Sequence, residues 1–440
     1  MSAPFYVVLP DFARARVALV RNGNGFSLPQ FSREEGTRFH TVASVNESVT
    51  SKWHIPVTVS RCLNPGENGQ PIVFSLHNHD QNWQLPPEAQ WVDVTALKDL
   101  PFNDGEQRLS LLDWLSSEGD ESWKSVPWSS SHWFARATEW INEKVESTGA
   151  TAIGAPTQIR VWALSTVLRV LTTAGTFYFK ALPDFFGHEP VLASYLLKHF
   201  PQYMVDIAAI EPDQHWMLTR EWAGIEPESK PDWHKVLQAM IEIQSHCTNN
   251  FDELLSFGCR DRRLAQLPTL LQPVHDELKQ PQMRQLYGVT EEEAEELSRR
   301  IRALPELCDR LIDCGIPETL IHGDLWGPNV LMRDTFSGKS PMIFDWTDAA
   351  ITHPFFDIYI VTTSEKNDSR RHDQEQAHID VWSDIVPNKK VVQALELSKQ
   401  VAPYYYLLAY RHVELNAPPQ SRWELLFLLT RFVRYVLDAK

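Results

Sequence analysis

Short apolar runs separated by turn residues fill the first part of the chain. The segment 22–25, Asn-Gly-Asn-Gly, lies between two such runs and is typical of a tight hairpin turn. Residues 39–53 carry a spacing that favours a helix. We therefore expect a β-rich unit with one helix over residues 1–120. Its predicted strands are residues 5–9, 15–21, 57–62, 71–77 and 91–94.

A polar stretch, residues 116–122, predicts a linker, and an amphipathic helix follows it. The helix has an apolar stripe from Trp133 to Val145, with Ser131 as a plausible N-cap. Its tryptophans fit either an aromatic ligand pocket or a helix that packs between domains, and we favour packing. Residues 121–150 are thus predicted to be a Trp-rich linker and docking helix.

Consecutive strands are predicted at residues 158–164, 167–172 and 176–182, with a tight turn at Ser165-Thr166. In the third strand Lys180 points away from the phenylalanines on either side of Tyr178, and a buried lysine needs an anionic partner. Glu189 opens the next helical run. Such a pair holds ATP phosphates in protein kinases, whereas the simpler alternative is a surface lysine and a glutamate that suits the helix dipole. Together with the segments around Asp324 and Asp345, which are described below, this pair favours the phosphate-binding interpretation.

Two further strands and a hinge complete a small lobe, predicted to span residues 151–224. The rest of the chain, residues 225–440, is predicted to be a mainly helical lobe. Thr290 and Glu293 form a capping-box pattern at the start of a long helix, in which we expect a break near Pro305. The other predicted helices cover residues 233–246, 260–277 (bent at its prolines), 373–382, 390–408 and 422–439.

Two apolar runs of the predicted helical lobe, residues 320–321 and 342–344, each end on a polar group. Asp324 and Asn329 follow the first run, and Asp345 ends the second. Phosphoryl transfer needs such oxygens: a carboxylate to accept the proton of a hydroxyl, and an amide oxygen and a second carboxylate to hold Mg²⁺. We expect His322 to brace this loop. A hydrolytic metal site of His322, Asp324 and His353 is disfavoured, because no second histidine lies one helical turn away.

The segments His322-Gly323-Asp324-Leu325 with Asn329, and Ile343-Phe344-Asp345-Trp346 with Asp357, resemble the aminoglycoside phosphotransferase/choline kinase family. The resemblance covers roughly residues 150–440. It implies an α+β, bilobal, protein-kinase-like fold that uses ATP or GTP and Mg²⁺ to phosphorylate a small-molecule hydroxyl. The roles it implies are Asp324 as catalytic base, Asn329 and Asp345 as metal ligands, Lys180 on the donor phosphates, Glu189 orienting Lys180, and Asp357 holding the catalytic loop.

This chain departs from the family pattern in its first hairpin, where Ser165-Thr166 stands in place of a glycine-rich stretch. The hydroxyls and backbone N–H groups of these two residues are the candidate phosphate contacts there. The N-terminal region lies outside the family pattern. Its order of elements is similar to the Nudix fold, through residues 16–31 and the Trp91 segment. Because Thr50 and Ser51 occupy the positions of the metal-binding glutamates, we expect a Nudix-like domain without hydrolase activity.

The net charge, the apolar runs and the cysteines of the sequence limit the kinds of partner and location that we expect for the protein. A net charge of −16 argues against a general nucleic-acid binder, and it permits a cationic acceptor, although solubility explains it more simply. Apolar runs long enough for a membrane span are absent from the sequence, and the first residues lack the pattern of a signal peptide. The five scattered cysteines lack zinc-site spacing, which favours a reduced, cytoplasmic location.

The acceptor stays open at this point. Acidic residues such as Asp348 suit an amine-bearing alcohol, whereas aromatic residues such as Trp326 suit a sugar, a macrolide or a quaternary amine. The tyrosines 404–406 and 410 fit either the core or an acceptor pocket, and core is favoured for most of them. A catalytically silent kinase-like module is the second hypothesis; a protein kinase and a bifunctional hydrolase are less favoured.

Overall fold

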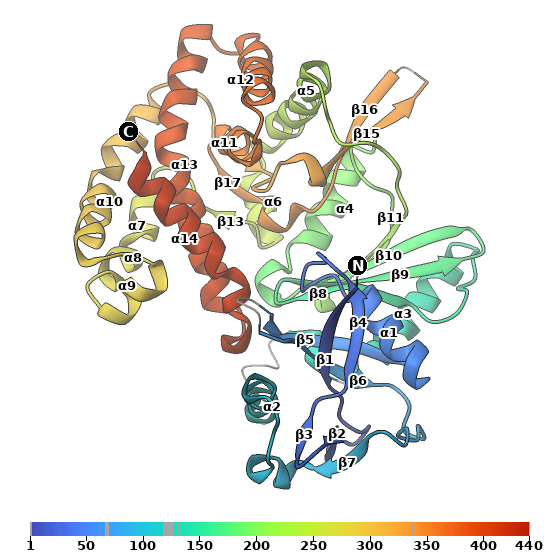
Figure 1. Ribbon diagram of the computed structural model, residues 1–440. Helices are drawn as coiled ribbons and strands as arrows, with labels where there is room; N and C mark the ends of the chain where they lie inside the picture. The colour runs from blue at the N-terminus through green and yellow to red at the C-terminus, as the bar shows by residue number, and fades with distance from the viewer. Residues whose placement is uncertain (1, 67–69, 118–125, 131, 337, 440) are drawn as a thin grey trace. The chain divides into compact units, whose positions relative to one another are not determined.

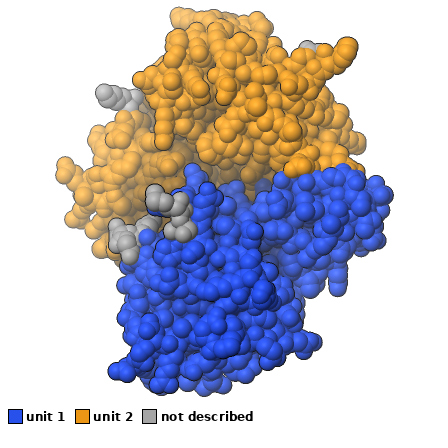
Figure 2. Space-filling model, turned by 45° about the vertical axis from the view of Figure 1, so that its right-hand side comes forward, with its two compact units in different colours: residues 1–184, 216–219, 417–422 blue, residues 185–215, 220–416, 423–440 orange. Residues whose placement is uncertain are grey.

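The computed structural model describes the chain except residues 1, 67–69, 118–125, 131, 337 and 440. Figure 1 shows its helices and strands in chain order, and Figure 2 distinguishes two compact units. Unit 1 consists of residues 1–184, 216–219 and 417–422, and unit 2 of residues 185–215, 220–416 and 423–440. Each unit is described by itself.

The N-terminal part of unit 1 is built on two small sheets, one in the order β4-β1-β6-β5 and one in the order β3-β2-β7. Strand β1 runs parallel to β6 and antiparallel to β4, so the first sheet is mixed. The elements are β1 (Ser2–Val8), β2 (Arg16–Asn22), β3 (Gly25–Ser27), β4 (Gln30–Glu34), α1 (Ala43–Trp53), β5 (Val57–Pro65), β6 (Ile72–Asn78), β7 (Gln90–Asp93), η2 (Val94–Asp99) and α2 (Gly105–Ser117).

A buried apolar cluster joins these elements. It includes Val8, Leu19, Val73 and Trp114, which come from β1, β2, β6 and α2. The predicted hairpin lies between β2 and β3, where Asn22 pairs with Gly25. The strands lie within a few residues of their predicted positions, but the prediction missed helix α2. Asp104 directly precedes this helix, and its side chain accepts hydrogen bonds from the backbone N–H groups of Glu106 and Gln107. The predicted 116–122 linker overlaps α2 at 116–117, and the rest lies outside the described residues.

The second part of unit 1 contains α3 (Trp133–Ser147), β8 (Thr157–Trp162), β9 (Ser165–Thr172), β10 (Gly175–Ala181) and β12 (Trp216–Arg220). The rings of Trp133, Trp140, Phe179 and Trp216 pack in T-shaped or tilted pairs with centroids 5.5–6.3 Å apart. These rings are all buried. The tryptophans of α3 therefore form core against the sheet, as the packing interpretation expected; Ser131, the predicted N-cap, lies outside the described residues.

The predicted turn at Ser165-Thr166 is wrong by two residues. Trp162 pairs directly with Ser165, so the turn consists of residues 163–164, and Ser165 and Thr166 belong to β9. The reason is hydrogen bonding: the Thr166 hydroxyl donates to the Arg160 carbonyl at 3.0 Å, and Ser165 Oγ accepts from Trp162 Nε1 at 3.0 Å. These local bonds hold both side chains in the strand ladder.

A buried glutamine ties the β8 segment to the N-terminal sheet. Gln158, 3% exposed, donates to the Val59 carbonyl at 3.0 Å and accepts from the Val59 N–H at 2.8 Å, which copies a backbone strand pairing. Asn46 of α1 also donates to Gln158. Of the predicted 1–120 and 151–224 domains, residues 1–184 and 216–219 belong to unit 1, and residues 185–215 and 220–224 to unit 2. The division into domains itself stays a prediction.

Unit 2 is mainly helical, with two small sheets. Its helices are α4 (Glu189–His199), α5 (Lys230–Cys247), α6 (Phe251–Ser256), α7 (Leu267–Leu270), α8 (Gln272–Glu277), α9 (Pro281–Tyr287), α10 (Glu291–Ile312), α11 (Phe355–Ser364), α12 (Asp368–Ser383), α13 (Asn388–Asn416) and α14 (Trp423–Asp438). Its strands are β11 (Ile207–Glu211), β13 (Arg260–Asp261), β14 (Thr319–Ile321), β15 (Val330–Thr335), β16 (Gly338–Ile343) and β17 (Ala350–Thr352).

Two helix predictions in this unit need correction. The predicted helix 260–277 is a short strand, β13, followed by two short helices that each begin with a proline in the first turn, where the missing N–H costs nothing. The expected break at Pro305 does not occur. Helix α10 continues through it, because its buried stripe of Leu297, Ile301, Leu304 and Leu311 outweighs one lost backbone bond. The Thr290–Glu293 capping box is confirmed, with both hydrogen bonds present.

The five cysteines are all buried, and none of them forms a disulfide. No helix in the described part of the chain combines the length and the apolar character that a membrane crossing requires.

Candidate active site

The predicted catalytic loop begins at the end of β14, a strand whose three residues are all buried. Strand β14 pairs antiparallel with β17, with Ile321 opposite Ala350. Gly323 follows with φ +82°, and a Cβ there would lie 2.3 Å from the carbonyl oxygen of Asp348. Only glycine fits both conditions, so the chain can bring residue 324 beside the segment that carries Asp345 and Asp348.

Asp357, at the start of α11, holds this loop from beneath. Its Oδ1 accepts from the Gly323 N–H at 2.9 Å and its Oδ2 from the His322 N–H at 3.1 Å. Gln244 of α5 donates to the same carboxylate at 3.4 Å. Burial raises the pKa of Asp357 to about 7, while the two backbone N–H groups act in the opposite direction. The position suits the loop-holding role that the resemblance implied. The sequence offered no signal for Gln244.

His322 is fully buried within the loop. Its Nε2 lies 2.9 Å from the Phe344 carbonyl oxygen, which can only accept, so Nε2 carries the proton. Its Nδ1 then accepts from the Asp324 N–H at 3.3 Å, and the ring packs on Trp346 with centroids 4.7 Å apart. With both nitrogens used in this way, His322 connects the Asp324 backbone to the segment before Asp345.

The Asp324 side chain meets Asn329 across the loop. Asn329 Nδ2 donates to Asp324 Oδ2 and to the Asp324 carbonyl oxygen, both at 2.9 Å, and Trp326 Nε1 donates to Oδ2 at 3.2 Å. Burial raises the pKa of Asp324 well above its ordinary value, and the negative charges of Asp348 and Asp345 raise it further. We call Asp324, Asp345 and Asp348 the acidic cluster.

The donor set of this cluster fits Mg²⁺, a hard ion that prefers oxygen ligands. Asn329 uses its NH₂ group on Asp324, and no described residue donates a hydrogen bond to its Oδ1. Asp345 adopts a left-handed backbone, φ +67°, which is unusual for a residue other than glycine, and its Oδ1 accepts from the Thr347 hydroxyl. A bound cation would reduce the repulsion between Asp324 and the negative charges of Asp345 and Asp348. Within the described residues, no group of three or more His, Cys, Asp or Glu is arranged so that it could hold a metal ion by itself. Mg²⁺ commonly takes some of its ligands from water and substrate phosphates.

Glu189 opens α4 in unit 2 and is 1% exposed. Its Oε1 accepts from the Trp346 N–H at 3.1 Å, so it contacts the backbone directly after Asp345. Lys180 belongs to β10 of unit 1, where it pairs with Val167. Because the predicted Lys180–Glu189 pair joins residues of different units, it stays a prediction.

The hydroxyls of Ser165 and Thr166, predicted to contact phosphate, are both nine-tenths or more buried. Thr166 Oγ1 also accepts from Gln158 Nε2 at 3.3 Å, in addition to its bond to the Arg160 carbonyl. The Thr166 hydroxyl therefore already has partners within the protein, and the predicted phosphate contacts of Ser165 and Thr166 stay a prediction.

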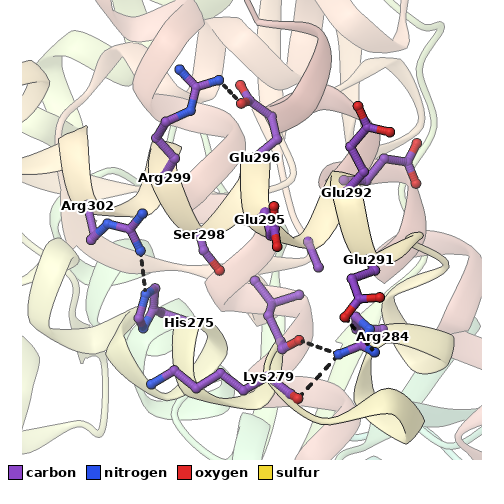
Figure 3. A pocket seen from close by; sticks show the side chains of 13 residues that line it. His275, Lys279, Arg284, Glu291, Glu292, Glu295, Glu296, Ser298, Arg299 and Arg302 are labelled. Carbon is purple, nitrogen blue, oxygen red and sulfur yellow. Dashed lines mark hydrogen bonds and ion pairs between the residues drawn. The ribbon is translucent and has the colours of Figure 1, made fainter.

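A surface cavity of about 920 Å³ lies among α8, α9 and α10, away from these residues in sequence and lining (Figure 3). Its charged side chains are partly paired with one another: Arg302 donates to His275 at 3.0 Å, and Arg299 pairs with Glu296. It includes none of the predicted site residues, and the paired charges indicate a solvated helix face.

A protein-family model matches the part of the chain that contains the candidate catalytic loop. Residues 218–384 match the family model described as "Phosphotransferase enzyme family". No curated protein sequence is detectably similar to this chain.

Solved structures with a similar fold include three small-molecule kinases. A macrolide 2'-phosphotransferase type I has 13% identity and a TM-score of 0.45, covering 69% of this chain and 98% of its own. An ethanolamine kinase from Plasmodium vivax has 9% identity and a TM-score of 0.46, covering 77% and 89%. A choline kinase from Streptococcus pneumoniae has 14% identity and a TM-score of 0.43, covering 68% and 99%. At this level of similarity, the functional argument rests on the residues of the site.

Proposed function

We propose that the protein transfers the γ-phosphoryl group of ATP or GTP to a hydroxyl group of a small molecule. The observation that carries the proposal is the loop from Ile321 to Asn329: Asp357 fixes its backbone, and Asn329 clamps Asp324 at 2.9 Å beside the charges of Asp345 and Asp348. A loop held this firmly presents one carboxylate and one amide oxygen in fixed positions, which suits a reaction that depends on positioning and charge.

Each residue has a defined role in this proposal. Asp324 orients the acceptor hydroxyl and takes its proton, and Asn329 and Asp345 would hold Mg²⁺. When bound, Mg²⁺ supplies positive charge to the donor phosphates and to the acidic cluster. Lys180 binds donor phosphates, and Glu189 keeps Lys180 and the backbone after Asp345 in position. His322 and Asp357 position the loop without contacting the acceptor.

We further propose a Nudix-like, non-hydrolytic role for residues 1–120. The support is the mixed sheet with helix α1 and the exposed Thr50 and Ser51 on that helix. Their hydroxyls are poor ligands for divalent cations compared with carboxylates.

The alternative function for the whole protein is a catalytically silent kinase-like module. It would leave the hydrogen-bonded Asp324 without a role.

The test is ATP consumption by the full-length protein with Mg²⁺ across amino alcohols, sugars, nucleosides, antibiotics and hydroxy acids. Turnover that depends on an acceptor, is lost in Asp324→Ala and is kept in a surface variant such as Glu295→Ala supports the proposal. Acceptor-dependent turnover that survives Asp324→Ala contradicts it. Nucleotide binding without turnover of any acceptor favours the silent module.

A further inference from the structure

Strand β13 places two arginines on one side of a sheet in unit 2. It pairs parallel with β17, with Arg260 opposite Ala350, and the Arg262 N–H donates to the Ile351 carbonyl at 2.9 Å. Side chains alternate along an extended chain. Arg260 and Arg262 therefore share one side, and Asp261 points to the other, where it pairs with Arg263 at 2.7 Å.

The Arg262 side chain is a buried cation without a carboxylate. Arg262 is 7% exposed, and its guanidinium lies over the Tyr405 ring, 5.5 Å from the centroid. Across the described part of the chain, no carboxylate forms an ion pair with Arg262 or with Arg260. Arg260 is half-buried and donates to the Phe185 carbonyl at 3.0 Å. Buried charges are normally paired, because leaving water is costly for an ion.

Helix α13 adds a third basic group. His412 lies seven residues after Tyr405, two helical turns along the same face. Burial lowers the pKa of His412, the charges of Arg260 and Arg262 act in the same direction, and together they bring it to about 3. Burial and the neighbouring Arg262 also lower the pKa of Arg260, to about 10. We call Arg260, Arg262 and His412 the arginine cluster; it has an excess of positive charge.

Tyr405 connects this cluster to the catalytic residues. It is 1% exposed, and the neighbouring Arg262 acts on its hydroxyl through a side-chain hydrogen bond that lowers the pKa of Tyr405. Its pKa responds to the charges of Arg262, Asp348 and Asp357, so its hydroxyl senses both groups of residues. The sheet register, Ile321 opposite Ala350 opposite Arg260, also puts Arg260 at the end of the sheet where the catalytic loop begins.

We propose that the arginine cluster binds an oxyanion, the carboxylate or phosphate group of the acceptor whose hydroxyl is presented to Asp324. The buried Arg262 guanidinium, the Tyr405 hydroxyl beside it and Arg260 are the donors. Guanidinium groups present parallel N–H donors that match carboxylate and phosphate oxygens. This inference rests on the proposed phosphotransferase function and specifies its substrate class: a hydroxy acid or a phosphorylated alcohol in place of the cationic acceptor that the net charge permits.

The charge arrangement supports this division of tasks. The acidic cluster occupies the end of the site where metal and donor phosphates are expected, and it repels an anionic group of the acceptor. The arginine cluster supplies the opposite charge beyond Tyr405. A hydroxy acid can satisfy both, with its hydroxyl toward Asp324 and its oxyanion toward Arg262.

Binding can be measured without turnover. Calorimetry with saturating ADP would compare D-glycerate, sn-glycerol 3-phosphate and inorganic phosphate with uncharged glycerol, in wild type and in three variants. Arg262→Met removes the buried cation, Tyr405→Phe removes only the hydroxyl beside Arg262, and Arg263→Met is the matched control on the opposite side of the strand. We expect the anions to bind, glycerol to bind roughly tenfold more weakly or not at all, and Arg262→Met to cost roughly tenfold or more.

Tyr405→Phe is expected to fold as wild type does and to bind the anions several-fold more weakly, which guards against misfolding of Arg262→Met. Arg263→Met is expected to bind as wild type does. The inference is overturned if no anion binds, if glycerol binds equally well, or if anion binding is unchanged in both Arg262→Met and Tyr405→Phe. Binding of carboxylates alone or of phosphates alone identifies the oxyanion. Loss of anion binding in these variants, with no phosphorylation of any acceptor, would uphold the anion site and contradict the proposed function.

Discussion

The acidic cluster and the arginine cluster are opposite in charge, and both belong to unit 2. In each, like charges crowd together: Asp345 and Asp348 raise the pKa of Asp324, and Arg260 and Arg262 lower the pKa of His412. Unlike a surface ion pair, neither cluster is balanced by its own side chains. Two clusters of crowded like charges, opposite in sign, are costly for folding alone, and they make sense as halves of a site that receives a metal ion on one side and an anion on the other.

The clusters differ in how they are built. The acidic cluster depends on one short loop whose backbone is fixed by Asp357 and whose turn needs Gly323. The arginine cluster depends on strand β13 and on helix α13, which are far apart in the sequence. The first construction leaves a compact motif in the sequence, and the second leaves none.

The largest expected effect comes from the acidic cluster. Asp324→Asn keeps the shape of the side chain and removes the base, so we expect the acceptor-dependent turnover number to fall by roughly 10²–10⁴. Thermal unfolding should stay near that of wild type. The measurement is coupled ATP consumption, with Glu295→Gln on the surface cavity as the matched carboxylate control. A loss confined to KM would contradict the role of Asp324 in proton transfer.

Asp345→Ala tests the metal side of the same cluster. Mg²⁺-dependent ATP binding stabilises the folded state, by about 2.7 kcal/mol when ATP is at 100 times its dissociation constant. We expect this stabilisation to disappear in the variant, as seen in the melting temperature with ATP and Mg²⁺ against ATP and EDTA. If the full Mg²⁺-dependent shift persists, Asp345 is not a ligand and the acidic cluster needs another explanation.

Asp357→Asn separates loop support from metal binding. The side-chain amide has one acceptor oxygen for the two backbone N–H groups of His322 and Gly323, so one of them loses its partner at a cost of about 1–3 kcal/mol. Urea unfolding should show this loss, and turnover should fall while Mg²⁺-dependent ATP binding remains. Equal loss of nucleotide binding would mean that Asp357 does more than hold the loop.

The sequence anticipated the helical lobe, most strands of the N-terminal region and the residues of the acidic cluster. These features are local: hairpin turns, helical stripes and the close spacing of Asp324, Asn329 and Asp345 are all written within short segments. The sequence predicted a helix where the structure has strand β13. A two-residue strand is defined only by its pairing, here with β17 about 90 positions later, and that pairing leaves no local signal.

The arginine cluster was out of reach for the same reason. Arg260 and Arg262 stood in a segment predicted to be helical, where residues two apart point in different directions; in a strand they share one side. His412 joins them through the packing of α13. The prediction for Ser165-Thr166 failed through a two-residue shift of a hairpin, which side-chain hydrogen bonds decide and hydrophobic pattern does not.

A buried histidine that belongs to neither cluster, His378, serves as a comparison for the lowered pKa of His412. His378 of α12 packs against Phe355 and Trp382, and its two ring nitrogens have no hydrogen-bond partner among the described residues. Its pKa is lowered to about 3, chiefly by burial. The pKa of His412 is also lowered chiefly by burial, with two arginines among its causes, whereas His378 has only the charge of His353 beside burial.

His378→Phe is the smallest predicted effect and concerns stability against acid. Because the folded pKa of His378 lies below its ordinary value of 6.5, the unfolded chain takes up a proton first as the pH falls. The contribution of His378 is therefore complete above pH 6.5 and is lost toward pH 3, by about 2 kcal/mol at pH 5. Phenylalanine cannot titrate, so denaturant unfolding of the variant should lose less stability between pH 7 and pH 5, while the exposed-site control His372→Phe keeps the wild-type slope. An unchanged slope in His378→Phe would mean that folding does not lower the pKa of His378. Burial would then not account for the lowered pKa of His412 either.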